Sequence, residues 1–82
     1  SFDIETVEGK ILSYFIQSQA ADTETIDINV TELGKQAMKE HKDIHKLVAS
    51  KMFNVKYEDV TDEQRRIAKT NNFRFMYKAG LI

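Results

Sequence analysis

Residues 61–82 read TDEQRRIAKTNNFRFMYKAGLI, and this stretch contains signals for both the start and the end of a helix. Thr61 is followed three residues later by Gln64, the spacing of a capping box, and two acidic residues stand in the first turn, where the helix dipole favours them. Gly80 suits the left-handed conformation in which many helices end. The stretch therefore predicts a helix from about residue 62 to about residue 79.

Two arcs of this helix differ in chemistry. Residues at four-residue steps lie on one slowly drifting ridge, which here is Arg65, Lys69, Phe73 and Tyr77. The apolar arc expected to contact the core is Ile67, Ala68, Phe75 and Ala79. Cations can bind phosphates and a ring can stack on a base, so the ridge is compatible with a nucleotide. Periodicity alone favours a plainer interpretation, in which the basic residues are solvated and the aromatic residues belong to the core.

A more specific indication comes from the run RRIAKTNNFRFMYKAG. It resembles the signature R-R-x-x-K-x-x-N-F-G-x-x-Y-G of the family A DNA polymerases, which forms the long helix of the fingers subdomain. The matching residues are Arg65, Arg66, Lys69, Asn72, Phe73 and Tyr77. Upstream, DIHKLVASKMF resembles the family segment D-I-H-x-x-x-A-x-x-x-F, and FDIETVEGKIL is similar to the first catalytic motif of the palm, D-Y-S-x-I-E-x-R.

The resemblance implies a role for each matching residue. In the first motif, Asp3 would bind the metal and Glu8 would crowd the sugar 2′ position. The implied nucleotide-binding residues are His45, Arg65, Arg66, Lys69, Phe73 and Tyr77. His45, Arg65 and Lys69 would contact the triphosphate. Phe73 would stack on the incoming nucleotide, and Tyr77 would lie where the template base meets the new pair.

The resemblance also implies a function for the chain. It would be a fragment or remnant of a DNA-directed DNA polymerase, a nucleotidyltransferase of DNA replication. Its partners would be a deoxynucleoside triphosphate, DNA and the rest of a polymerase, with Mg²⁺ bound only in the complete enzyme. One carboxylate motif cannot hold two metal ions, so the isolated chain is expected to be inactive.

The sequence departs from the family pattern at two glycines. Arg74 and Lys78 stand where the family has glycine after the phenylalanine and after the tyrosine. An alternative function follows from this difference: a non-catalytic helical module that binds nucleic acid or protein, with Arg74 and Lys78 as new basic contacts. Sequence motifs of hydrolases and of phosphate-cradling glycine loops are absent.

Composition limits the remaining classes of protein. Eighty-two residues, 41% of them hydrophobic, predict one domain spanning 1–82 with a small core. The absence of cysteine excludes disulfides and thiolate metal sites. No apolar run is long enough for a membrane span, so we expect a cytoplasmic protein. The first residue is Ser1 rather than methionine, so we expect a processed or trimmed product or a piece of a longer protein. Motifs that begin three residues from one end, with a signature helix that finishes at the other, favour a piece or a remnant.

The net charge is −1, but its distribution along the chain is uneven. Residues 1–31 hold six acidic residues against one lysine, a balance of −5, and residues 32–82 have a balance of +4. The second part of the chain can therefore present basic groups to phosphate.

The remaining segments predict a mainly α fold of about four helices with a minor N-terminal extended or β element. We expect an extended segment at residues 1–7 and a helix at about 6–19. A second extended segment at 20–30 would pair with residues 2–4. Two helices are expected after these segments. One is capped by Thr31, runs to about Glu40 and buries Leu33, Ala37 and Met38, and the other spans 44–53 and is capped by Asp43. His45 falls off the apolar face of the latter helix and is expected to be exposed surface.

Overall fold

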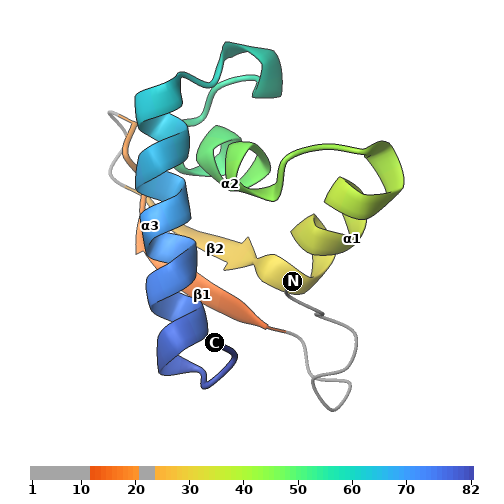
Figure 1. Cartoon of the computed structure of the whole chain (residues 1–82). Helices are drawn as coiled ribbons and strands as arrows, with labels where there is room; N and C mark the ends of the chain where they lie inside the picture. The colour runs from red at the N-terminus through yellow and green to blue at the C-terminus, as the bar shows by residue number, and fades with distance from the viewer. Residues whose placement is uncertain (1–11, 21–23) are drawn as a thin grey trace.

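The computed structural model describes residues 12–20 and 24–82. In chain order they form β1 (Ser13–Gln17), β2 (Thr25–Asn29), α1 (Val30–Glu40), α2 (Ile44–Phe53), a 3-10 turn η2 (Tyr57–Asp59) and α3 (Asp62–Lys78). Figure 1 shows α3 running along one side of the molecule, with the β1–β2 hairpin and α2 packed beside it and α1 at the far side. A mainly α fold with a small β element is confirmed. The described residues contain three α-helices rather than about four.

The missing helix is a strand. The prediction of a helix at 6–19 is wrong over residues 13–17, which form β1 and pair antiparallel with β2, from Ser13 opposite Asn29 to Gln17 opposite Thr25. In β1 the side chains alternate, so Tyr14 and Ile16 pack against the core while Phe15 is exposed. The apolar residues of this segment fit a helix face as well, but the strand is favoured because β2 supplies a partner for hydrogen bonding. The extended segment expected at 1–7, and its proposed pairing through residues 2–4, lie outside the described residues.

Both middle helices begin at a capping side chain. Asp43 caps α2 as predicted, and its Oδ1 accepts hydrogen bonds from the backbone amides of His45 and Lys46. For α1, however, Asn29 is the cap, because its Oδ1 accepts from the Glu32 amide at 3.0 Å, and the prediction of Thr31 as the cap is wrong. The hydroxyl of Thr31 instead accepts a hydrogen bond from the Leu12 amide and so ties α1 to the start of the hairpin.

The hydrophobic core lies where α2 meets the hairpin and the other two helices. Its largest fully buried side chains are Ile28, Val48 and Met52. Met38, expected to be buried, is 75% exposed, because α1 buries only the face that carries Leu33 and Ala37. Helix α2 thus forms the centre of the packing.

The buried stripe of α3 consists of Ala68, Asn72 and Met76. Of the four residues expected there, Ala68 is fully buried and Ile67 and Phe75 pack partly against the core, but Ala79 is exposed because the helix ends one residue before it. The predicted stripe was rotated away from the observed one, because only apolar residues were expected in it and Asn72 was left out. The Asn72 side chain can be buried because the oxygen and the nitrogen of its amide are both hydrogen-bonded.

The ends of α3 agree with prediction. The Thr61 side chain accepts from the Gln64 amide at 3.1 Å and the Gln64 side chain accepts from the Thr61 amide at 3.0 Å, which completes the capping box. Gly80 has φ of 74°, in the left-handed region. These two local signals set the length of the helix that carries the ridge.

Replacing Thr61 by alanine is expected to lower the free energy of unfolding by about 1 kcal/mol, because it removes one half of the capping box. Urea denaturation measures the difference. Thr70→Ala is the matched control, since Thr70 is exposed in the middle of α3 and its change should stay within about 0.5 kcal/mol. An equal loss in both variants would contradict a role of the cap.

Candidate functional site

The candidate site lies where the N-terminus of α2 meets the first half of α3. Asp43 joins the two helices: its Oδ1 caps α2, and its Oδ2 accepts a hydrogen bond from Arg65 Nε at 2.7 Å. Partial burial acts to raise the pKa of Asp43, but the hydrogen bonds from Arg65 and from the two backbone amides outweigh it, so its pKa lies below the ordinary value. Asp43 is therefore an ionised anchor that orients Arg65.

His45 follows two residues later and is half-buried, which corrects the expectation that it is exposed surface. Burial is the main reason why its pKa is lowered; Asp43 acts to raise it, and Arg65 and Lys69 act to lower it further. The imidazole is therefore held neutral at pH 7, and its tautomer becomes the important property.

Asn72 determines that tautomer. Its Oδ1 accepts a hydrogen bond from the Tyr14 hydroxyl, and its Nδ2 lies 3.0 Å from His45 Nδ1. An amide nitrogen can only donate, so His45 Nδ1 is the acceptor and the proton is on Nε2. Burial raises the pKa of Tyr14 to about 12, which keeps its phenol protonated as the donor to Asn72. One buried amide thus links β1, α2 and α3.

Lys69 and Phe73 complete the cluster. Lys69 Nζ lies 5.5 Å from the centroid of the Phe73 ring, and the Phe73 and His45 rings meet edge to face with centroids 5.6 Å apart. Phe73 remains 44% exposed, so a large part of its ring is open to a ligand. We name this group the cation–aromatic cluster: Asp43, His45, Arg65, Lys69 and Phe73.

Other predicted residues lie apart from this cluster. Tyr77, 74% exposed, continues the ridge one turn beyond Phe73. Arg66 is on the exposed surface, where its guanidinium forms a bidentate pair with Glu63. Asp3 and Glu8 lie outside the described residues.

Sequence reasoning named the basic and aromatic members of the cluster but assigned no binding or orienting role to Asp43, Asn72 or Tyr14. The sequence predicted Asp43 only as a helix cap, and it identified Asn72 only as one of the residues that match the family signature. Tyr14 carried no local signal, since its contact with Asn72 spans 58 positions in the chain. Tertiary packing alone identifies these three as the residues that orient Arg65 and His45.

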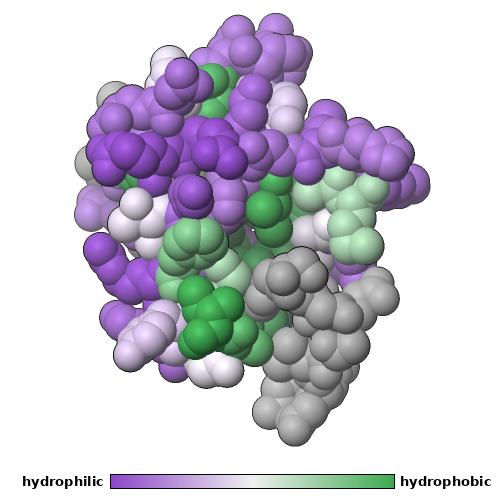
Figure 2. Space-filling view, viewed as in Figure 1, coloured by the Kyte–Doolittle hydropathy of each residue, from purple (hydrophilic) through white to green (hydrophobic). Residues whose placement is uncertain are grey.

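The two ends of the viewed face differ in hydropathy. Figure 2 shows hydrophilic residues gathered over the upper half of the viewed face, where the first half of α3 lies in Figure 1, and apolar residues nearer the C-terminal end of that helix. None of the helices in the part of the chain that the structure describes is long and apolar enough to cross a membrane. Within the same residues, no three His, Cys, Asp or Glu side chains come together as a metal site.

The long helix α3 thus carries Arg65, Lys69 and the 44% exposed Phe73 ring next to the hydrogen-bonded amide of Asn72. Comparison with known proteins defines the family: the model of DNA polymerase family A matches residues 27–81, more than half of the chain. The chain belongs to DNA polymerase family A. The match includes the whole of the cation–aromatic cluster.

Individual relatives agree with this assignment. The chain is 51% identical to DNA polymerase I of Treponema pallidum over 41 residues, which is 50% of this chain and 4% of that protein. It is 35% identical to DNA polymerase I of Pseudomonas aeruginosa over 86 aligned residues, which is 90% of this chain and 9% of that protein. The chain therefore spans less than a tenth of the length of these relatives. No solved structure is significantly similar.

Proposed function

We propose that residues 1–82 form one unit that resembles the fingers and the palm edge of a family A polymerase, and that this unit contributes contacts to a deoxynucleoside triphosphate and to the template. The observation that supports this proposal most is the convergence of Lys69, Phe73 and the His45 ring at one place on the surface. A cation next to an exposed ring can hold a phosphate and a base of the same ligand.

Each member of the cluster has a distinct role in this proposal. Lys69 binds the triphosphate as a point charge, while the neutral His45 donates a hydrogen bond to it from Nε2. Arg65 is held in place by Asp43 and offers its remaining guanidinium N–H groups. Phe73 stacks on the incoming nucleotide, and the exposed Tyr77 lies further along α3, toward the template base.

Arg66 is the weakest member of the proposed set. To reach a phosphate, its guanidinium would have to break the ion pair with Glu63 or bind the Glu63 carboxylate and the phosphate at the same time. Because this pair is on the exposed surface, separating it costs little, so a secondary contact with the nucleotide remains compatible with the geometry.

Metal binding and catalysis belong to the complete enzyme in this proposal. Mg²⁺ would supply charge neutralisation at the transferring phosphate, with Asp3 as one of its ligands. In this proposal the cluster positions the triphosphate, and its one carboxylate, Asp43, is paired with Arg65. We infer that the isolated chain does not extend a primer. Primer extension above background by the purified chain would contradict this inference.

The alternative of a non-catalytic helical module has less support, because the relatives that share this stretch are DNA polymerases.

Titration with dATP tests the proposed contacts. Amide shifts should centre on His45, Lys69 and Phe73, and Lys69→Met should weaken binding roughly tenfold, because it removes one charged contact of about 1.5 kcal/mol while keeping the apolar stem beside Phe73. Lys51→Met, which removes an exposed lysine at the other end of α2, is the control and should bind dATP like the unchanged chain. Equal affinity in all three proteins would contradict the proposal.

A further inference from the structure

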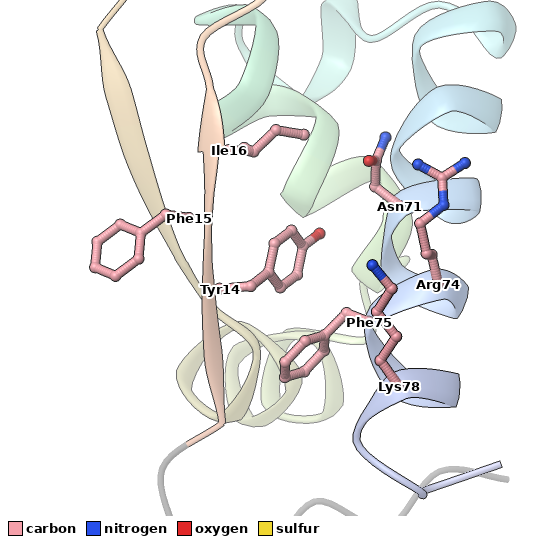
Figure 3. A pocket seen from close by; sticks show the side chains of 7 residues that line it. All are labelled: Tyr14, Phe15, Ile16, Asn71, Arg74, Phe75 and Lys78. Carbon is pink, nitrogen blue, oxygen red and sulfur yellow. The ribbon is translucent and has the colours of Figure 1, made fainter.

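A second concave surface lies between β1 and α3, away from the cation–aromatic cluster. Its volume is about 220 Å³, and its lining residues are Tyr14, Phe15, Ile16, Asn71, Arg74, Phe75 and Lys78. Figure 3 shows Tyr14 and Ile16 reaching from the strand toward α3, while the Phe15 ring points away on the opposite face of β1. We call this surface the strand–helix groove.

The floor of the groove is apolar and its rim is basic. Tyr14 and Phe75 pack with ring centroids 4.9 Å apart, and Ile16 lies next to them on the strand. Arg74 and Lys78 stand about one turn apart on the helix side, both exposed, and neither forms an ion pair with a described residue. Asp27, the acidic residue of the hairpin strands, is opposite Phe15 and shares its outward face, so it does not neutralise the rim.

The groove is separate from the proposed triphosphate site. At 100° per residue, Lys78 lies about 180° around α3 from Lys69, and the buried stripe of the helix runs between the two sides. The two basic rim residues stand where the family pattern has glycine. The groove is therefore not the site that the family signature describes.

We propose that the strand–helix groove binds an unpaired segment of nucleic acid, with one base against the Tyr14–Phe75 floor and the neighbouring phosphates on Arg74 and Lys78. A volume below the roughly 300 Å³ at which sites for drug-sized ligands begin suits one planar ring rather than a larger molecule. Two cations beside aromatic rings match the combination of basic groove and stacking surface that binds single strands without sequence preference. An acidic peptide would satisfy the cations but would leave the aromatic floor without a ring to cover it.

Fluorescence anisotropy with a labelled 12-nucleotide oligodeoxythymidylate tests this proposal. The double variant Arg74→Gln and Lys78→Gln should raise the Kd about tenfold at low salt and reduce the slope of log K against log salt by roughly 1.4, since each lost phosphate contact removes about 0.7. The matched control is Lys35→Gln with Lys51→Gln, two exposed lysines of α1 and α2, which makes the same change in net charge. An equal loss in the control would overturn the proposal, because binding would then depend on net charge alone.

Two further measurements separate this groove from other possibilities. Saturating dATP should leave oligonucleotide binding unchanged, whereas competition by dATP would place the strand at the cation–aromatic cluster and overturn the assignment to the groove. A polyglutamate peptide that binds as tightly as the oligonucleotide, with the same loss in the double variant, would overturn the proposal by identifying an acidic protein as the partner. Amide shifts from the oligonucleotide should include Tyr14, Asn71 and Phe75.

Discussion

Asn72→Asp should move the proton of the neutral His45 ring from Nε2 to Nδ1 and raise the pKa of His45 above its ordinary value. In the unchanged chain Asn72 Nδ2 donates to Nδ1, whereas a carboxylate at position 72 can only accept, so Nδ1 must carry a proton. The charged groups that face His45, namely Asp43, Arg65 and Lys69, are the same in both proteins. The change in tautomer and pKa can therefore be attributed to position 72.

Stability should respond to pH with opposite sign in the two proteins. With Asn72, the pKa of His45 is lowered on folding. The contribution of neutral His45 to the free energy of unfolding is therefore present above the ordinary pKa of 6.5 and is lost as pH falls through the folded pKa. In the Asn72→Asp variant the pKa of His45 is raised, so the contribution of the pair is present below 6.5 and is lost as pH rises through the new folded pKa. Imidazole ¹⁵N shifts and urea denaturation between about pH 5 and about pH 8.5 measure both effects.

Asn71→Asp supplies the control, because it introduces the same charge one residue away. The Asn71 amide donates to the Ile67 carbonyl and does not touch His45. His45 should keep its tautomer in this variant, and a similar shift in both variants would show that Asn72 has no specific effect.

Asn72→Ala should destabilise the chain by about 2–4 kcal/mol, because it leaves the Tyr14 hydroxyl and His45 Nδ1 without their partner.

A consequence for binding follows from the Asn72→Asp variant. At about pH 8, the new carboxylate would leave His45 Nε2 as an acceptor, which repels a phosphate oxygen instead of donating to it. The affinity for dATP should therefore fall at that pH and recover toward about pH 5.5, where the imidazolium donates from both nitrogens. A loss of affinity that is equal at both pH values would indicate a general structural effect.

Met52→Ala should lower the free energy of unfolding by about 2–5 kcal/mol. Met52 is fully buried in α2, at the centre of the packing between the helices and the hairpin, and truncating such a side chain removes apolar contacts and leaves a cavity. A domain of this size has a total stability of only about 3–5 kcal/mol, so a substantial fraction of this variant would be unfolded at about 37 °C.

Two substitutions make this prediction testable even if Met52→Ala does not fold. Met52→Leu nearly conserves volume and should cost less than about 1.5 kcal/mol, which thermal denaturation can measure. Met38→Ala removes the same atoms from a side chain that is 75% exposed, and its effect should stay within about 0.5 kcal/mol. Equal losses at positions 38 and 52 would contradict the central place of α2 in the core.

Local signals were sufficient to predict two of the helices. The capping box at Thr61 and the glycine at position 80 set the bounds of α3, and Asp43 set the start of α2, because each of these contacts joins residues within a few positions of one another. The motif resemblance correctly predicted the family, since it depends on the order of side chains along the chain. It also selected three residues that converge in space: His45, Lys69 and Phe73.

Residues 13–17 illustrate why the remainder could not be predicted. Their apolar residues fit both a helix face and a strand, and pairing with β2, a non-local contact, favoured the strand. The same strand then places Tyr14 against Asn72, whose amide fixes the donor nitrogen of His45.

By itself, the sequence determined where α2 and α3 begin, which cations and rings share the ridge, and the membership in DNA polymerase family A. Only the tertiary structure decided that a polar residue occupies the buried stripe, that Asp43 restrains Arg65, and that a basic groove forms beside β1. The physical reason is distance along the chain: caps and ridges arise from neighbours a few residues apart, whereas burial, tautomers and grooves arise where distant segments meet.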